Sequence, residues 1–252
     1  MMARAGQVRT SKWPRLSLAV RALRRIKSNE ELGAVIENTR ALYRLDHITF
    51  LIVHDGISPH PYPFYCTTYP HEWTDVYLSR NYFDVDPVIA LSRTGFSPVN
   101  WSDLKRASAT ADAFFKEARS FGIGRHGLSL PVRGPNGERS ILSVTSNTAG
   151  KVWSRLRNSS IHDLHIFAHC LHEKAISFSN RSAGSVYKTL SRREKQCLEL
   201  LAQGKLIKRV ASDLGISENA VRLYLRSARR KLGAATLYQA MARASFMEKI
   251  HI

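Results

Sequence analysis

The sequence predicts an α+β protein with an N-terminal α-β-α sandwich around a central antiparallel sheet, linked to a C-terminal all-α domain of four helices that contains a helix-turn-helix unit. Three observations lead to this prediction. Strand-like segments in the first half join through short turns, which favours antiparallel pairing. A small, polar stretch at 177–187 has the composition of a linker. Beyond it, short amphipathic helices begin at capping residues and end at glycines.

Positive charge is concentrated at the two ends of the chain. The 252 residues carry a formal net charge of +18, of which residues 1–30 contribute +7, residues 31–184 only +2 and residues 185–252 the other +9. This length is sufficient for two domains, each with its own core. A nearly neutral body joined to a basic module is typical of a sensing or catalytic domain fused to a module that binds a polyanion.

The first 28 residues are interpreted as a basic arm. They are rich in arginine and poor in acids, like an organelle transit peptide, but their composition favours a disordered or partly helical arm. No apolar run approaches the roughly eighteen residues of a membrane helix. The three cysteines lie far apart, which is typical of a reducing compartment. We therefore expect a cytoplasmic protein with no membrane partner, no disulfide framework and no zinc site.

The first domain, placed at 29–176, alternates between helical and strand patterns. Its apolar periodicity predicts helices at 29–45, 71–80, 109–120 and 151–178 and strands at 47–53, 63–69, 127–133 and 139–146. The turn sequence GPNGE between the last two strands predicts a hairpin.

The stretch FGIGRHGLSLP contains the spacing of a dinucleotide-binding turn at Gly122, Gly124 and Gly127. These glycines follow a helical pattern and precede a strand, which is the reverse of the order that nucleotide binding requires, and no acid lies at the ribose distance. The same stretch is not a nucleophile elbow either, because Pro131 stands where the last glycine would be. A dinucleotide enzyme or a serine hydrolase is therefore not predicted.

Capping residues and glycines divide the C-terminal domain, placed at 188–252, into helices. Ser191 and Glu194 have capping-box spacing, and Gly204 ends that helix. Gly215 ends a second short helix, and Ser217 caps a third. A fourth helical pattern at 236–249 has a weakly apolar side for the first helix or for a second subunit. A short helix, a tight turn and a basic third helix form a helix-turn-helix unit.

The third helix has two opposite faces. The apolar stripe consists of Val221, Leu225, Ala228 and Leu232. Much of the other face is basic, with Arg222, Arg226, Arg229 and Arg230. Four arginines alone would indicate only a solvated face, but after the caps and the turn they predict binding of double-stranded DNA. Guanidinium groups can bond guanine edges bidentately or contact phosphates.

The segment LSRREKQCLELLAQGK and the later VASDLGISENAVRLYLRSARRKLG resemble the LuxR-type DNA-binding domain. The signature Glu, Leu and Gly of that family correspond to Glu194, Leu198 and Gly204. The resemblance implies that base contacts fall on Arg222 and Arg226.

Residues 69–101, YPHEWTDVYLSRNYFDVDPVIALSRTGFSPVNW, resemble the ligand-pocket stretch of the acyl-homoserine-lactone receptors in the same family. The corresponding residues are Tyr69, Trp73, Tyr77, Asp86 and Trp101. A G-x-x-x-P element that enters a strand is matched by Gly127 and Pro131. The resemblance covers roughly residues 30–250.

The ligand of such receptors has one amide N–H, two carbonyls and an apolar tail, so its pocket needs one acceptor, a few donors and apolar walls. The resemblance implies that Asp86 accepts the amide N–H, that Trp73 donates to the lactone carbonyl and that Tyr69 donates to the amide carbonyl. Ser143 would add a hydroxyl. In the same way, Trp101 would pack against the lactone ring, and Tyr77 would wall the tail.

The resemblance implies a ligand-responsive transcription factor that binds an inverted-repeat operator as a homodimer and uses no cofactor. An alternative is a LuxR-type regulator that answers a different small molecule or none. The aromatics could also be ordinary core, although an unpaired carboxylate among them would be costly. A lactone-processing enzyme would need a nucleophile elbow or a metal cluster, and a response regulator would need an acidic phospho-acceptor pocket; neither pattern is present.

Four histidines follow one face of the long helix expected at 151–178. They are His162, His165, His169 and His172. Spacings of three and four can place two imidazoles on one metal, but a row along a helix does not converge on one ion. A solvated face or a subunit contact is the preferred interpretation.

Overall fold

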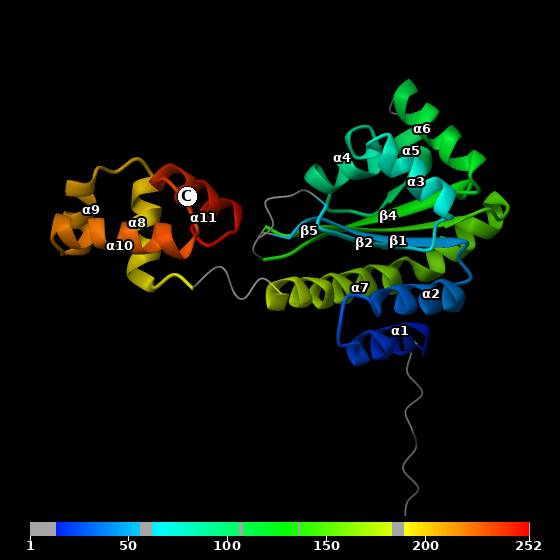
Figure 1. Ribbon diagram of the computed structural model, residues 1–252, viewed down its shortest axis with the longest axis horizontal. Helices are drawn as coiled ribbons and strands as arrows, with labels where there is room; N and C mark the ends of the chain where they lie inside the picture. Colours follow the sequence, from blue (N-terminus) through cyan, green and yellow to red (C-terminus); the bar gives the residue numbers. More distant parts are fainter. Residues whose placement is uncertain (1–13, 56–61, 106–107, 136, 183–188, 252) are drawn as a thin grey trace, which may run out of the picture. The chain divides into compact units, whose positions relative to one another are not determined.

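The computed structural model describes residues 14–55, 62–105, 108–135, 137–182 and 189–251. They form two compact units, one built around a β-sheet and one that contains the C-terminal helices (Figure 1). This is the predicted α+β class. No helix within the described ranges is both long and apolar enough to cross a membrane.

The sheet has five strands in the order β2-β1-β5-β4-β3. Their bounds are β1 (His47–His54), β2 (Phe64–Thr67), β3 (Val99–Asn100), β4 (His126–Arg133) and β5 (Arg139–Ser146). β1 pairs antiparallel with β2, which places Thr49 opposite Thr67. The predicted hairpin between β4 and β5 is confirmed, since the N–H of Gly134 donates to the carbonyl of Glu138 at 2.9 Å. Asn136, in the middle of that turn, lies outside the described residues.

Helices cover both faces of the sheet (Figure 1). One face carries α2 (Leu32–Tyr43) and α7 (Gly150–Ser182), with α1 (Pro14–Arg25) packed on the outer side of α2. The other carries α3 (His71–Ser79), the 3-10 turn η1 (Tyr82–Asp84), α4 (Pro87–Thr94), α5 (Trp101–Lys105) and α6 (Ala109–Ser120). Because both faces are covered, β4 and β5 are buried almost continuously. Their apolar side chains form a core in which each buried leucine, isoleucine or phenylalanine contributes about 1.5–3 kcal/mol.

The segment expected to be a basic arm contains the helix α1. Leu16, Ala19 and Leu23 are buried on one side of it, and α1 packs against α2. The guanidinium of Arg15 lies 5.9 Å from the ring centroid of Tyr43 on α2. Residues 14–25 are thus an integral part of the sheet-containing unit, whereas residues 1–13 lie outside the described residues.

The long helix α7 continues beyond the predicted end at residue 178 and includes the start of the expected linker. The rest of that linker, residues 183–187, lies outside the described residues. The C-terminal unit contains α8 (Arg192–Ala202), α9 (Ile207–Leu214), α10 (Glu218–Lys231) and α11 (Leu237–Phe246).

The predicted caps of the C-terminal helices are confirmed. Ser191 and Glu194 form a complete capping box. Gly204 and Gly215 have φ values of 85° and 63°, the left-handed conformation that ends a helix and favours glycine. The hydroxyl of Ser217 accepts from the N–H of Ala220 at 3.1 Å. The apolar stripe of α10 is buried against α8 and α9, as its spacing predicted.

Candidate functional site

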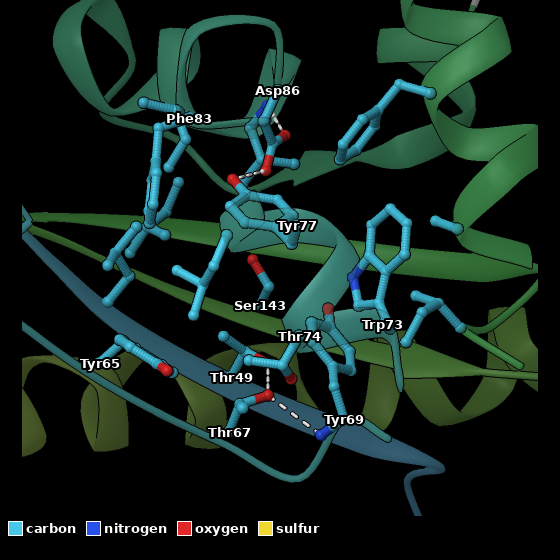
Figure 2. Close-up of a pocket in the computed structure, with 18 of the residues that line it drawn as sticks. Thr49, Tyr65, Thr67, Tyr69, Trp73, Thr74, Tyr77, Phe83, Asp86 and Ser143 are labelled. Atoms are coloured by element: carbon cyan, nitrogen blue, oxygen red, sulfur yellow. Dashed lines mark hydrogen bonds between the residues drawn. The ribbon is translucent and has the colours of Figure 1, made fainter. Parts of the chain in front are cut away.

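A pocket of about 760 Å³, including the space at its mouth, lies between the sheet and the helices α3–α6 (Figure 2). Its walls are mainly apolar and aromatic. All six side chains singled out from the sequence line this one pocket: Tyr69, Trp73, Tyr77, Asp86, Trp101 and Ser143. They come from the loop after β2, from α3, from the starts of α4 and α5, and from β5. Residues up to 74 positions apart in the chain are thus brought together by the fold.

Asp86 is the carboxylate of the pocket, and both of its oxygens are held in place. Oδ1 accepts the N–H of Val88 at 2.8 Å and so caps α4, with Pro87 at the first helical position. Oδ2 accepts the hydroxyl of Tyr77 at 2.8 Å (Figure 2). Burial raises the pKa of Asp86 to about 6, although these hydrogen bonds act in the opposite direction. The group is therefore mostly ionised at neutral pH and fixed in orientation.

Tyr77 has a second function beside the expected one. The resemblance assigned it to the tail wall, and it does line the pocket. Its hydroxyl also orients Asp86, a contact that was not predicted from the sequence, because it joins α3 to the start of α4 across nine residues.

Trp73 is buried at the centre of an aromatic cluster. Its ring centroid lies 5.5–5.9 Å from those of Tyr77, Tyr82, Phe114 and Phe121, in tilted or edge-on arrangements that aromatic rings favour. Its indole nitrogen faces the interior of the pocket (Figure 2). The cluster fixes the ring and leaves the N–H on the pocket side.

The indole N–H of Trp101, unlike that of Trp73, is not available to the pocket. It donates to the hydroxyl of Ser129 on β4 at 2.8 Å, and Ser129 in turn lies 2.8 Å from the hydroxyl of Ser143. Gly127 explains why the ring can lie so close to β4, because a Cβ at this position would overlap the indole of Trp101. This packing is the structural reason for the glycine that first resembled a nucleotide-binding turn.

Sequence reasoning missed several hydroxyl residues near the pocket, among them Thr49, Thr67 and Ser129. Thr49 and Thr67, opposite each other on β1 and β2, line the pocket and have their Oγ1 atoms 2.5 Å apart. The backbone N–H of Tyr69 donates to Thr67 at 3.0 Å (Figure 2). Ser129 lies behind the wall. A polar residue inside an apolar strand, as Thr49 is in HITFLIV, was the available signal.

The second candidate surface is α10. All four predicted arginines on it are exposed: Arg222, Arg226, Arg229 and Arg230. Arg222 forms a long ion pair with Glu218, 3.6 Å across one turn. Arg229 donates to the carbonyl of Ala235 at 3.4 Å. The buried stripe therefore holds the helix while its guanidinium groups remain accessible to a polyanion.

The histidines of α7 do not share one environment. The rings of His165 and His169 are stacked with centroids 5.1 Å apart. His172, by contrast, is buried, and its Nδ1 lies 2.7 Å from the hydroxyl of Ser140. The interpretation of a solvated face is therefore wrong for His172, because the helix turns that position toward the sheet. In the part of the chain that the structure describes, no three His, Cys, Asp or Glu side chains are grouped to hold a metal.

Comparisons with known proteins assign both halves of the chain. Residues 28–175 match the model of the autoinducer binding domain, and residues 188–244 match that of bacterial regulatory proteins of the luxR family. The transcriptional activator protein RaiR of Rhizobium etli is 50% identical over 174 residues, which are 69% of this chain and 72% of RaiR. VanR of Vibrio anguillarum is 32% identical over 178 residues, 70% of this chain and 72% of VanR.

Solved structures show the same fold. Escherichia coli SdiA superimposes with a TM-score of 0.66 at 24% identity, covering 93% of this chain and 96% of SdiA. A structure of SdiA in complex with octanoyl-rac-glycerol gives a TM-score of 0.68 at 22% identity, covering 97% of this chain and 100% of that one. With an autoinducer-binding domain followed by a DNA-binding helix-turn-helix domain, the chain belongs to the luxR family of bacterial transcriptional regulators.

Proposed function

We propose that this regulator binds an N-acyl-homoserine lactone in the pocket and, as a homodimer, binds an inverted-repeat DNA operator through α10. The observation that carries the proposal is the set of polar groups in a mainly apolar pocket. One fixed carboxylate acceptor, Asp86, faces three donors, Tyr69, Trp73 and Ser143. An acyl-homoserine lactone offers the complementary set of one N–H and two carbonyl oxygens.

In this proposal Asp86 accepts the amide N–H, a charge-assisted bond. Trp73 donates to the lactone carbonyl, and Tyr69 and Ser143 donate toward the amide carbonyl. Trp101 contributes only its ring face, because its N–H is already bonded to Ser129. The acyl chain extends along the apolar wall beside Tyr77, and the shape of that wall sets the preferred chain length.

For DNA binding we assign base contacts to Arg222 and Arg226 and phosphate contacts to Arg229 and Arg230. Two protomers would place two copies of α10 in successive major grooves, which an inverted repeat requires. The exposure of all four arginines on a firmly packed helix supports this assignment. We also propose 29–176, 177–187 and 188–252 as receptor domain, linker and DNA-binding domain, with α1 packed onto the first.

A second ligand class is a monoacylglycerol, since a solved SdiA structure holds octanoyl-rac-glycerol. Such a ligand has an ester carbonyl and hydroxyls but no amide. Asp86 would then accept an O–H, and the carbonyl would meet the same donors.

The experiment is a thermal-melt series of the full-length protein with lactones of graded chain length and with 1-octanoylglycerol. We expect the melting temperature to rise and to peak at one lactone chain length, because a ligand stabilises the folded state that binds it. Asp86→Asn should lose most of that rise. A rise with the glyceride alone would replace the lactone by the second class, and no rise with either would refute ligand binding of both kinds.

A further inference from the structure

Ser129 lies behind the wall of the pocket rather than in it. It is fully buried on β4, and its hydroxyl has two partners, the indole N–H of Trp101 and the hydroxyl of Ser143, each at 2.8 Å. An indole N–H can donate but never accept. The oxygen of Ser129 must therefore accept from Trp101, which leaves the one hydrogen of Ser129 for the bond to Ser143.

The opposite assignment of donor and acceptor between the two serines would leave a buried hydrogen without an acceptor. If Ser143 donated to Ser129, the oxygen of Ser129 would accept twice, and its own hydrogen would point into the packed core. Buried polar hydrogens without partners are strongly disfavoured. Ser143 therefore accepts from Ser129, and its own hydrogen remains for the pocket, toward which its hydroxyl points (Figure 2).

A second chain of hydrogen bonds, through two half-buried threonines, leads to the other hydroxyl donor of the pocket, Tyr69. It starts at the backbone N–H of Tyr69, which donates to Thr67 at 3.0 Å. Thr67 lies 2.5 Å from Thr49. Burial raises the pKa of the Tyr69 hydroxyl, and the Thr49 side chain acts in the opposite direction, as a hydroxyl that donates toward the phenolic oxygen does. Passing one hydrogen along each step leaves the phenolic hydrogen of Tyr69 for the pocket. Both chains thus begin at a group that can only donate and end at a hydroxyl of the pocket.

We infer that Ser129 and Thr67 are positioning residues that fix Ser143 and Tyr69 as hydrogen donors, so that the pocket selects ligands with a carbonyl oxygen there. A ligand with N–H or O–H at that position would face two donors. The inference rests on the proposed function, because it specifies how the amide carbonyl of the lactone is recognised.

The test is a pair of double-mutant cycles on the full-length protein, with dissociation constants measured for the lactone that gives the largest melting shift. Ser129→Ala should weaken binding about fivefold, the usual value of one neutral hydrogen bond. In a Ser143→Ala background the same change should have almost no further effect. Thr67→Val, a change of similar shape, should likewise weaken binding only while the Tyr69 hydroxyl is present and not in Tyr69→Phe.

A purely packing role predicts the opposite result. Ser129→Ala and Thr67→Val would then weaken binding by the same factor in both backgrounds, and this additivity would overturn the inference. Ser140→Ala is the matched control, because Ser140 is equally buried on β5 but bonds His172 outside the pocket. We expect its affinity for the lactone to equal that of the wild type.

Folding is the foreseeable difficulty with Ser129→Ala, which leaves the N–H of Trp101 without an acceptor. The Thr67 cycle is independent of it, and circular dichroism of the ligand-free Ser129→Ala protein shows whether it is folded before its affinity is measured. If wild type binds lactone and both cycles are additive, only the inference fails. If wild type binds no lactone, the proposed function fails and the inference falls with it.

Discussion

The pocket and the helix α10 differ in how far their polar groups are exposed to solvent. In the pocket, each oxygen of Asp86 already has a protein partner, and the hydroxyl of Ser143 is held from behind. On α10 the four arginines extend into water, and their few partners are distant. The pocket therefore presents a few hydrogen-bonding groups in fixed orientations, whereas the helix presents several positively charged side chains that can adjust to their partner.

This difference determines what each region responds to. Exposed charges are screened by salt and contribute nearly independently. Buried polar groups act as units, are weakly screened and are sensitive to protonation. We therefore expect changes in the pocket to depend on pH and to be coupled, and changes on α10 to depend on salt and to be additive.

The largest effect is expected on operator DNA. Changing both Arg222 and Arg226 to alanine should reduce specific affinity by roughly a hundredfold or more, since each bidentate base contact is worth about 1–3 kcal/mol. Titration of fluorescently labelled operator DNA with the protein measures this loss of affinity. The control for total charge is the double change Lys151→Ala with Arg155→Ala, two exposed bases of α7. The lactone-induced melting shift should be unchanged, and an equal loss on random DNA would show that these arginines only contact phosphates.

Glu194 tests whether buried and exposed charges also differ within the DNA-binding unit, because it is a buried charge there. It accepts from the N–H of Ser191 at 2.6 Å and from Lys231 at 2.8 Å. Burial alone would raise the pKa of Glu194, but these bonds outweigh it and hold the pKa below its usual range. Its stabilising contribution is therefore present at neutral pH and is lost only as acid titrates the folded carboxyl.

We expect Glu194→Ala to destabilise the C-terminal unit by about 2–3 kcal/mol, because it removes half of a capping box and leaves Lys231 without its ion-pair partner. Urea unfolding followed by circular dichroism measures this loss. Arg192→Ala, a change at an exposed position of the same helix, is the comparison. Equal stability of the two variants would contradict the assigned role of the cap.

Local sequence signals were sufficient for most of the C-terminal unit. Ser191, Gly215 and Ser217 act on neighbours within a few residues, so their spacing determines where helices begin and end. The same kind of signal existed at Asp86 and Pro87, where a cap followed by proline starts α4. The prediction assigned Asp86 to the ligand alone and contained no helix at 87–94.

Tertiary pairs explain what the sequence could not predict. The bonds from Ser129 reach Trp101 and Ser143, 28 and 14 residues away, and no local pattern reports such pairs. The family resemblance identified residues that line the pocket but not the groups behind them. In α1 the apolar positions Leu16, Ala19 and Leu23 have helical spacing, but the surrounding arginines dominated the interpretation as an arm.

A smaller effect is expected from pH acting on Asp86. With a pKa of about 6 before ligand binds, this carboxyl is mostly protonated at pH 5 and mostly ionised at pH 7. Since the carboxylate is the better acceptor, lactone affinity should fall up to about tenfold between pH 7 and pH 5. Isothermal titration at both pH values measures this, and Asp86→Asn should lack the dependence.

The stability of the ligand-free protein should change in the opposite direction. Because burial raises the pKa of Asp86 above that of the unfolded chain, the folded state takes up the proton first as the pH falls through about 6. The contribution of this group to the free energy of unfolding therefore increases toward acid. The difference between wild type and Asp86→Asn isolates it from other titrating groups. If lactone affinity and ligand-free stability both fell between pH 7 and pH 5, Asp86 could not be the cause of both changes.

The smallest effect is expected from a single phosphate contact. Arg230→Ala should weaken binding to all DNA sequences alike, a few-fold at about 0.1 M salt, and should reduce the slope of log affinity against log salt by about one. Arg229→Ala should reduce the slope similarly but also loosen the turn before α11, because Arg229 donates to the carbonyl of Ala235. Affinity measured over a salt series on operator and random DNA separates the two. If Arg230→Ala changed the ratio of operator to random affinity while leaving the slope intact, Arg230 would be a base contact, and the division of α10 into base-contacting and phosphate-contacting arginines would have to be redrawn.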